Sequence, residues 1–185
     1  MARRRLVQRL QSIASIGFNE GRIGFITICL KDKNINLDYC RTYLVVDERQ
    51  TKILEVAELV SKSEGKILFI SRLHPDLIRE KIIGEIAEAI WLSERPNERS
   101  IPPQQLGKLL QRISIFVKKE KPAIVFLDGL EYLSLFNDFS RLQMFVEQLN
   151  DIIMESRAIL LIAVDPRLFD QRSLAKLRRF AEIVS

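Results

Sequence analysis

The chain has 185 residues, 47% of them hydrophobic and 29% charged, which excludes a disordered or collagen-like protein and fits one domain with an appendage. Its longest apolar run, Ala158–Val164, has seven residues, whereas a membrane-spanning helix needs about 20. The net charge of +5 falls entirely in residues 1–42, because these carry eight Lys and Arg against three acids while the remainder is balanced.

Residues 1–42 are predicted to form a basic N-terminal extension. Leu6, Leu10 and Ile13 recur at helical spacing and predict an amphipathic helix, and the residues over 25–30 predict a strand. We expect that strand to pair with the sheet edge of its own domain or of a second subunit. Arginines near the start are candidate contacts for phosphate groups or an acidic partner, and a solvated tail is the alternative. These arginines are Arg3, Arg4, Arg5 and Arg9.

Residues 43–185 are predicted to form an α/β domain, because short apolar runs alternate with segments of helical periodicity. Three of the runs are apolar throughout, which is typical of strands buried on both faces of a parallel sheet. The fold class that follows is α/β, a three-layer open and mostly parallel sheet of about five strands. The strands are expected over 43–47, 67–70, 89–92, 123–127 and Ala158–Val164, and the helices over 53–60, 74–83, 106–117, 142–153 and 174–181.

The cysteines and the single histidine exclude several kinds of site. Cys29 and Cys40 form no CxxC pair, and with His74 alone there is no Cys/His zinc set. No cofactor and no metal cluster are therefore expected. Polar residues interrupt the apolar segment that would follow the first arginines of a secretory signal, so we expect free thiols and a cytoplasmic location.

Polar side chains follow the predicted strands and mark a candidate crevice for a ligand or a metal ion. Carboxyl ends of parallel strands meet at one edge of an open sheet, where ligands bind, and acids there commonly hold Mg²⁺. The alternative is structural, because aspartate is also a good helix cap and turn former. The candidate residues are Arg72, His74, Asp128, Glu131 and Asp165.

The sequence lacks a phosphate-binding loop. The lysines of Gly65-Lys66 and Gly107-Lys108 have no second glycine at the spacing that a P-loop requires, and no GxGxxG occurs. The turn after the first predicted strand, 47–52, contains no glycine, and its acids Asp47 and Glu48 would repel phosphate. A nucleotide is therefore not expected there.

Three stretches resemble the mainly archaeal domain-of-unknown-function family 835. They are Ile70-Ser-Arg-Leu-His-Pro75, Ile90-Trp-Leu-Ser93 and Phe126-Leu-Asp-Gly-Leu-Glu-Tyr-Leu133, and the similarity extends from about Tyr43 to the C-terminus. The resemblance implies a fold and a lineage but no activity.

A second similarity is to the ATPase core of RecA and KaiC-like proteins. There the strand ending at Asp128 matches the Walker B strand, whose aspartate holds Mg²⁺ through water. The first predicted strand and the Gly-Lys-Ile-Leu-Phe-Ile-Ser strand also match, but the Walker A turn is reduced to 47–52. The resemblance therefore implies a degenerate, RecA/KaiC-like fold without ATP hydrolysis.

Three functions follow as hypotheses. The first is a non-catalytic protein-interaction or scaffold module, expected to self-associate or bind a protein partner. The second is a nucleotide- or Mg²⁺-responsive regulatory domain, or an enzyme, that uses the strand-end crevice. The third is nucleic-acid binding without sequence preference through the basic arm. No membrane association is expected.

Overall fold

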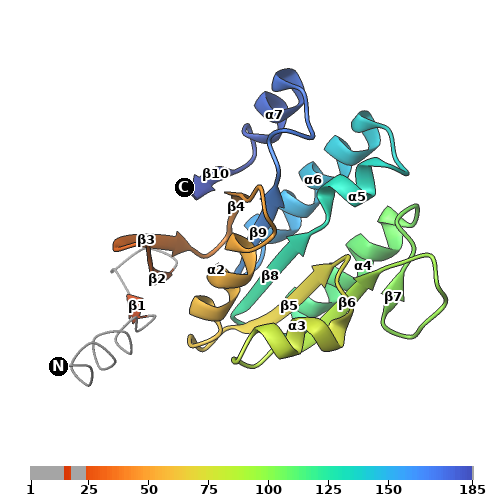
Figure 1. The fold of residues 1–185 in the computed structure, drawn as a ribbon. Helices are drawn as coiled ribbons and strands as arrows, with labels where there is room; N and C mark the ends of the chain where they lie inside the picture. Colours follow the sequence, from red (N-terminus) through yellow and green to blue (C-terminus); the bar gives the residue numbers. More distant parts are fainter. Residues whose placement is uncertain (1–14, 18–23, 185) are drawn as a thin grey trace.

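The computed structural model describes residues 15–17 and 24–184, and it has a parallel seven-stranded sheet at its centre (Figure 1). The strand order is β10-β4-β9-β8-β5-β6-β7, and every neighbouring pair is parallel. The strands are β4 (Arg41–Val46), β5 (Lys66–Ser71), β6 (Glu88–Leu92), β7 (Ser100–Ile101), β8 (Ala123–Asp128), β9 (Ala158–Val164) and β10 (Glu182–Val184). The predicted α/β class is confirmed.

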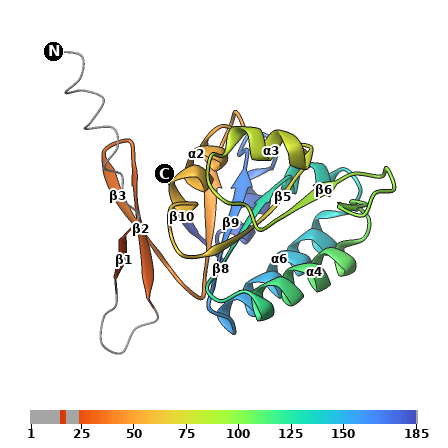
Figure 2. The same ribbon diagram turned by 90° about the horizontal axis from the view of Figure 1, so that it is seen from below.

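Helices cover both faces of this sheet (Figure 2). Helices α2 (Lys52–Val60) and α3 (Pro75–Lys81) pack on one face, and α4 (Leu106–Lys119) and α6 (Phe139–Met154) pack on the other. Two shorter helices, α5 (Leu130–Ser134) and α7 (Gln171–Leu177), lie on the side of α6. Because both faces are covered, every residue of β8 and β9 is buried, which explains why both strands are apolar up to Asp128 at the end of β8.

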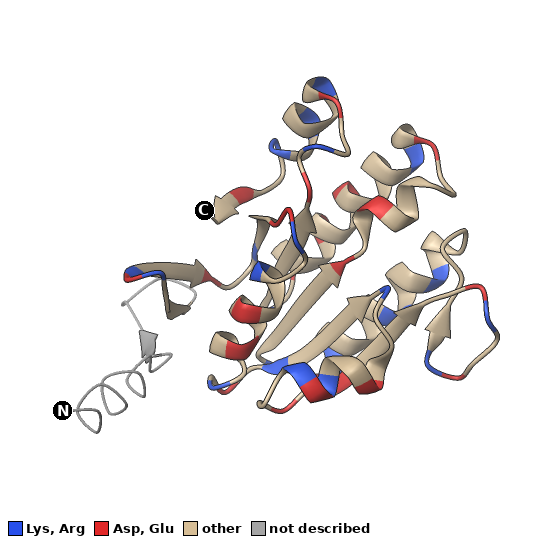
Figure 3. Cartoon of the chain, viewed as in Figure 1, with Lys and Arg blue, Asp and Glu red and all other residues tan. Residues whose placement is uncertain are grey.

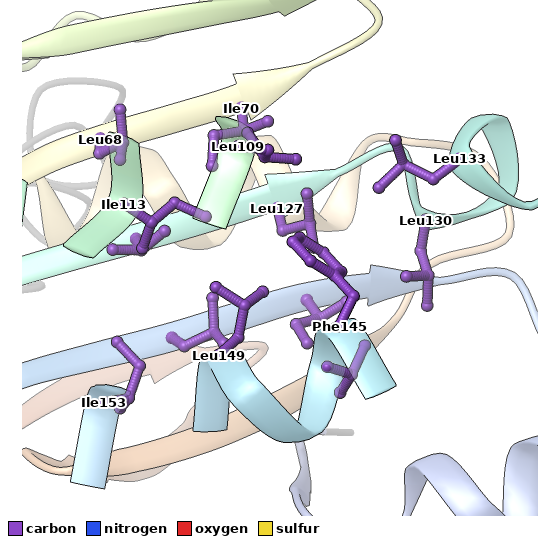
Figure 4. Packing of buried hydrophobic residues seen from close by; sticks show 14 of the residues in the cluster. Leu68, Ile70, Leu109, Ile113, Leu127, Leu130, Leu133, Phe145, Leu149 and Ile153 are labelled. Carbon is purple, nitrogen blue, oxygen red and sulfur yellow. The ribbon is translucent and has the colours of Figure 1, made fainter. Parts of the chain in front are cut away.

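The larger core lies between the sheet and helices α4 and α6 (Figure 4). Apolar residues recur on each helix at the spacing of a single face, so each helix presents one continuous stripe to the strands. The residues in this contact include Leu109 and Ile113 of α4, Phe145, Leu149 and Ile153 of α6, and Leu68, Ile70 and Leu127 of the sheet.

The strand predicted over 25–30 is present as β2 (Phe25–Leu30), but it does not join the edge of the central sheet. It pairs with β1 (Ser15–Gly17) and β3 (Lys33–Asp38) in a separate antiparallel sheet. The apolar side chains on one face of the β2–β3 hairpin are buried in the same core as α2. The hairpin turn uses Lys31 and Asp32 at positive φ, the backbone conformation that tight hairpins require.

Two expectations for the C-terminal part and the strand number need correction. The helix expected over 174–181 ends at Leu177, and the chain then turns and adds β10 beside β4. The sheet has seven strands rather than about five, because β7 has two residues and β10 has three. Strands this short carry no periodicity that a sequence pattern can detect.

The amphipathic helix predicted from Leu6, Leu10 and Ile13 lies outside the described residues, and so do Arg3, Arg4, Arg5 and Arg9. Within the described part of the chain, every helix is too short or too polar to cross a bilayer.

Candidate functional site

The carboxyl ends of β4, β8 and β9 surround an acidic cavity of about 280 Å³. These three strands are adjacent in the sheet, so the residues that follow them gather at one edge. Figure 3 shows acidic residues in red at this edge. The acids that line the cavity are Asp47, Glu48, Asp128, Glu131 and Asp165.

Asp47 caps the turn that leads from β4 into α2. Its Oδ1 accepts hydrogen bonds from the backbone N–H groups of Arg49 and Thr51, each at 3.2 Å. Its Oδ2 accepts a third from the N–H of Ile53, at 2.8 Å. The Asp47 side chain is buried, so one internal carboxylate pairs two N–H groups of the turn before α2 and the N–H of Ile53 in its first turn.

Asp128 ends β8 and is buried beside β5. Its Oδ2 accepts a 2.6 Å hydrogen bond from the Ser71 hydroxyl, at the corresponding position of the neighbouring strand. The Ser71 Oγ accepts in turn from the Leu73 N–H, at 2.9 Å. Burial raises the pKa of the Asp128 carboxyl, the Ser71 hydrogen bond opposes that rise, and the charge of Asp47 adds to it. The Asp128 carboxylate is therefore hydrogen-bonded to a side chain of the neighbouring strand β5, and not to the turn at Gly129.

Glu131 lies on α5 and connects this helix to the end of β9. Its Oε1 accepts a 2.7 Å hydrogen bond from the backbone N–H of Asp165. Burial raises the pKa of the Glu131 carboxyl, against the effect of that hydrogen bond, and the nearby Asp128 and Asp165 carboxylates raise it further. Two neighbouring carboxyl groups in the cavity thus bind a proton more tightly than they would in water.

Asp165 has a different environment, because an arginine neutralises it. The Arg167 side chain donates to both Asp165 oxygens, at 2.9 and 2.7 Å, and also to the Glu48 carbonyl at 2.7 Å. The Arg167 hydrogen bond lowers the pKa of Asp165. Through Arg167 the loop after β9 is tied to the loop after β4.

Arg72 and His74 lie at the end of β5 on the side of β6, and neither is among the residues that line the acidic cavity. The Arg72 guanidinium carbon lies 4.8 Å from the centre of the Tyr132 ring and 5.8 Å from that of Trp91. The His74 ring meets the Trp91 ring edge-on at 5.0 Å, and the Trp91 Nε1–H donates to the Arg72 carbonyl at 3.0 Å. We call these four residues the Arg72 cluster.

The predicted crevice therefore divides into two surfaces. Asp128, Glu131 and Asp165 gather in the acidic cavity, whereas Arg72 and His74 belong to the Arg72 cluster. Trp91 and Tyr132 were not predicted to be site residues. Trp91 could have been recognised because it is the only tryptophan of the sequence and lies near the end of a predicted strand.

No group of three or more Asp, Glu, His or Cys side chains within the described ranges is arranged to hold a metal ion. The Asp128 and Glu131 carboxylates each already accept a hydrogen bond from the protein. Cys40, the more buried of the two thiols, donates to the Ser156 carbonyl and lies away from this edge.

Two comparisons with known proteins bear on this chain. A family described as "Protein of unknown function (DUF835)" matches residues 46–180. This match agrees with the resemblance seen in the sequence and covers both the acidic cavity and the Arg72 cluster. Among curated proteins, no match was found.

Proposed function

The chain belongs to the DUF835 family, and from the geometry at the carboxyl edge of its sheet we propose that it is a non-catalytic module that binds a protein partner. The observation that carries the proposal is that the Asp47 carboxylate accepts hydrogen bonds from three backbone N–H groups in the β4–α2 turn and the first turn of α2. In nucleotide-binding α/β proteins, N–H groups at this kind of turn hold phosphate.

Asp47 disfavours a nucleotide in two ways. It occupies the donors that a phosphate would need, and its negative charge together with that of Glu48 repels an incoming anion. The similarity to RecA and KaiC-like proteins is compatible with this, because the β4–α2 turn corresponds to their Walker A turn. We therefore propose a degenerate form of that fold in which an internal carboxylate stands where the phosphate would be.

The Arg72 cluster supports binding of a protein. Trp, Tyr and Arg are the residues most enriched among those that dominate the energy of protein interfaces. Arg72 is exposed, and stacking against two rings together with a 3.2 Å hydrogen bond to the Leu92 carbonyl holds its guanidinium in place. A side chain that is already ordered loses less conformational entropy when a partner binds.

Co-purification with a variant at this cluster tests the proposal. Full-length tagged protein is recovered from its native lysate as wild type, as Arg72→Ala and as Ile115→Ala, an exposed apolar control on α4. We expect a partner that is retained by wild type and by the control, lost with Arg72→Ala at unchanged melting temperature, and indifferent to added Mg-ATP. Equal retention by all three proteins, or release by Mg-ATP, contradicts the proposal.

The other functional hypotheses stay predictions. Binding of nucleic acid would depend on Arg3, Arg4, Arg5 and Arg9, which lie outside the described residues. A Mg²⁺ response would depend on Asp128. Self-association, archaeal origin and cytoplasmic location also remain predictions.

A further inference from the structure

A cavity of about 590 Å³ lies at the amino end of β4, whereas the acidic cavity lies at the carboxyl end of the same strand. Its walls come from the start of β4 (39–42), the C-terminal part of α6 (Asn150 and Met154) and the connection from α7 to β10 (178–182) (Figure 1). Sites for small molecules typically have volumes of about 300–1,000 Å³. We call this space the amino-end cavity.

The lining of the amino-end cavity has an excess of positive charge. Arg41, Arg178 and Arg179 contribute to it, and its single acid is Glu182. Glu182 pairs with Arg41 at 3.6 Å, so the charge of this acid is already compensated. Arg178 and Arg179 form no ion pair with another described residue. Three arginines against one glutamate give the lining a net charge of +2, which favours an anionic ligand.

Apolar side chains and one amide lie in the same lining as these arginines. Met154, Phe180 and Ala181 supply the apolar part, and Met154 is 60% exposed. The side-chain amide of Asn150 has one contact among the described residues, a donation to the Met154 sulfur at 3.2 Å. A thioether is a weak acceptor, so this amide is available to a ligand. The lining therefore suits a molecule that has an apolar body and an anionic head group.

We propose that the amino-end cavity binds a small organic phosphate monoester. A phosphate monoester carries a charge of about −1.5 to −2 at neutral pH, which complements the net charge of the lining. The guanidinium groups of Arg178 and Arg179 donate to the phosphate oxygens, and Met154 and Phe180 contact the apolar body. A carboxylate has one charge and two acceptor oxygens, so it binds more weakly. The inference goes beyond the proposed function, because the cavity is separate from the Arg72 cluster.

Calorimetric titration of the full chain with 1-naphthyl phosphate, in the absence of Mg²⁺, tests the inference. The matched controls are 1-naphthoate, which has the same rings and a carboxylate, and 1-naphthol, which is uncharged at neutral pH. We expect the phosphate to bind more tightly than either control, and its binding to weaken with added salt. Arg178→Glu and Arg179→Glu should each weaken it by about tenfold. Arg172→Glu, a reversal at an exposed position of α7 that does not line the cavity, should leave it unchanged.

Hydrogen exchange provides the second measurement and locates the bound molecule. With 1-naphthyl phosphate present, we expect slower amide exchange within residues 178–182, because a ligand that binds the folded state opposes local opening. Exchange within 47–53, at the other end of β4, should not change. No binding of 1-naphthyl phosphate, equal binding of 1-naphthoate, equal effects of Arg172→Glu and Arg178→Glu, or slower exchange within 47–53 alone each overturns the inference.

Discussion

The backbone N–H of Ile53 lies 2.8 Å from Asp47 Oδ2, and this bond places an internal carboxylate against the first turn of α2. The N–H groups of Arg49 and Thr51 also donate to the same side chain. A helix start with free N–H groups is a binding site for anions, and here the protein supplies the anion itself. The turn between β4 and α2 therefore has its N–H groups paired within the protein.

Asp47→Ala is expected to lower the free energy of unfolding by about 1–2 kcal/mol, because the N–H groups at the start of α2 lose their acceptor. Urea unfolding at neutral pH measures the change. Glu48→Ala is the matched control, since Glu48 is the next acid along the chain and its side chain is exposed. Equal stability of Asp47→Ala and wild type would mean that the cap contributes nothing.

Asp128→Asn tests the buried carboxyl through the pH dependence of stability. Because the folded-state pKa is raised above 3.8, folding favours the protonated form. The stability contributed by Asp128 is therefore fully present below about pH 3.8 and is lost as the pH rises through the raised pKa. Asparagine does not titrate, so we expect the stability of wild type relative to the variant to fall over that range.

Urea unfolding at a series of pH values measures this difference, with Asp151→Asn on the exposed face of α6 as the control. A gap between wild type and Asp128→Asn that widens in favour of wild type as the pH rises contradicts the electrostatic account. Mg²⁺ provides a separate test. Stabilisation of wild type by Mg²⁺ that is absent in Asp128→Asn would assign a metal to Asp128 and support the regulatory alternative.

Gly129→Ala is expected to destabilise the protein by about 1–3 kcal/mol. Gly129 has φ +147°, and a Cβ there would lie 2.8 Å from Leu92 Cδ1. Thermal or urea unfolding measures the cost. Gly107→Ala is the control, because a Cβ on that helical glycine meets nothing within 4 Å and alanine favours a helix. A Gly129→Ala protein as stable as Gly107→Ala would show that the turn after β8 tolerates a side chain.

The sequence predicted the interior strands well because their environment determines their composition. β8 and β9 are buried on both faces, so they are apolar except for Asp128 at the end of β8, and their bounds were predicted to within a residue. β3 was missed because Lys33–Asp38 is polar on its exposed face and has few apolar residues. β10 was missed because Phe180 and Ala181 extend the helical spacing of α7 beyond the point where the helix ends.

The candidate site could be predicted only in part, because strand order is not encoded locally. Asp128 and Asp165 were expected to meet, and β8 and β9 are indeed neighbours. Arg72 was expected in the same crevice. However, β5 lies between β8 and β6, and the Arg72 guanidinium donates to the Leu92 carbonyl at the end of β6 while its carbon lies near the Tyr132 and Trp91 rings. A single sequence shows which residues follow strands, but not which neighbouring strand supplies their contacts.

Calorimetric titration of the full chain with Mg-ATP tests the central claim most directly. If the Asp47 carboxylate occupies the N–H groups at the start of α2, no binding tighter than about millimolar is expected, which corresponds to roughly 4 kcal/mol. The same titration of Asp47→Ala shows whether removing the carboxylate frees those donors. Micromolar binding of Mg-ATP to wild type would contradict the account and would make the acidic edge a nucleotide site.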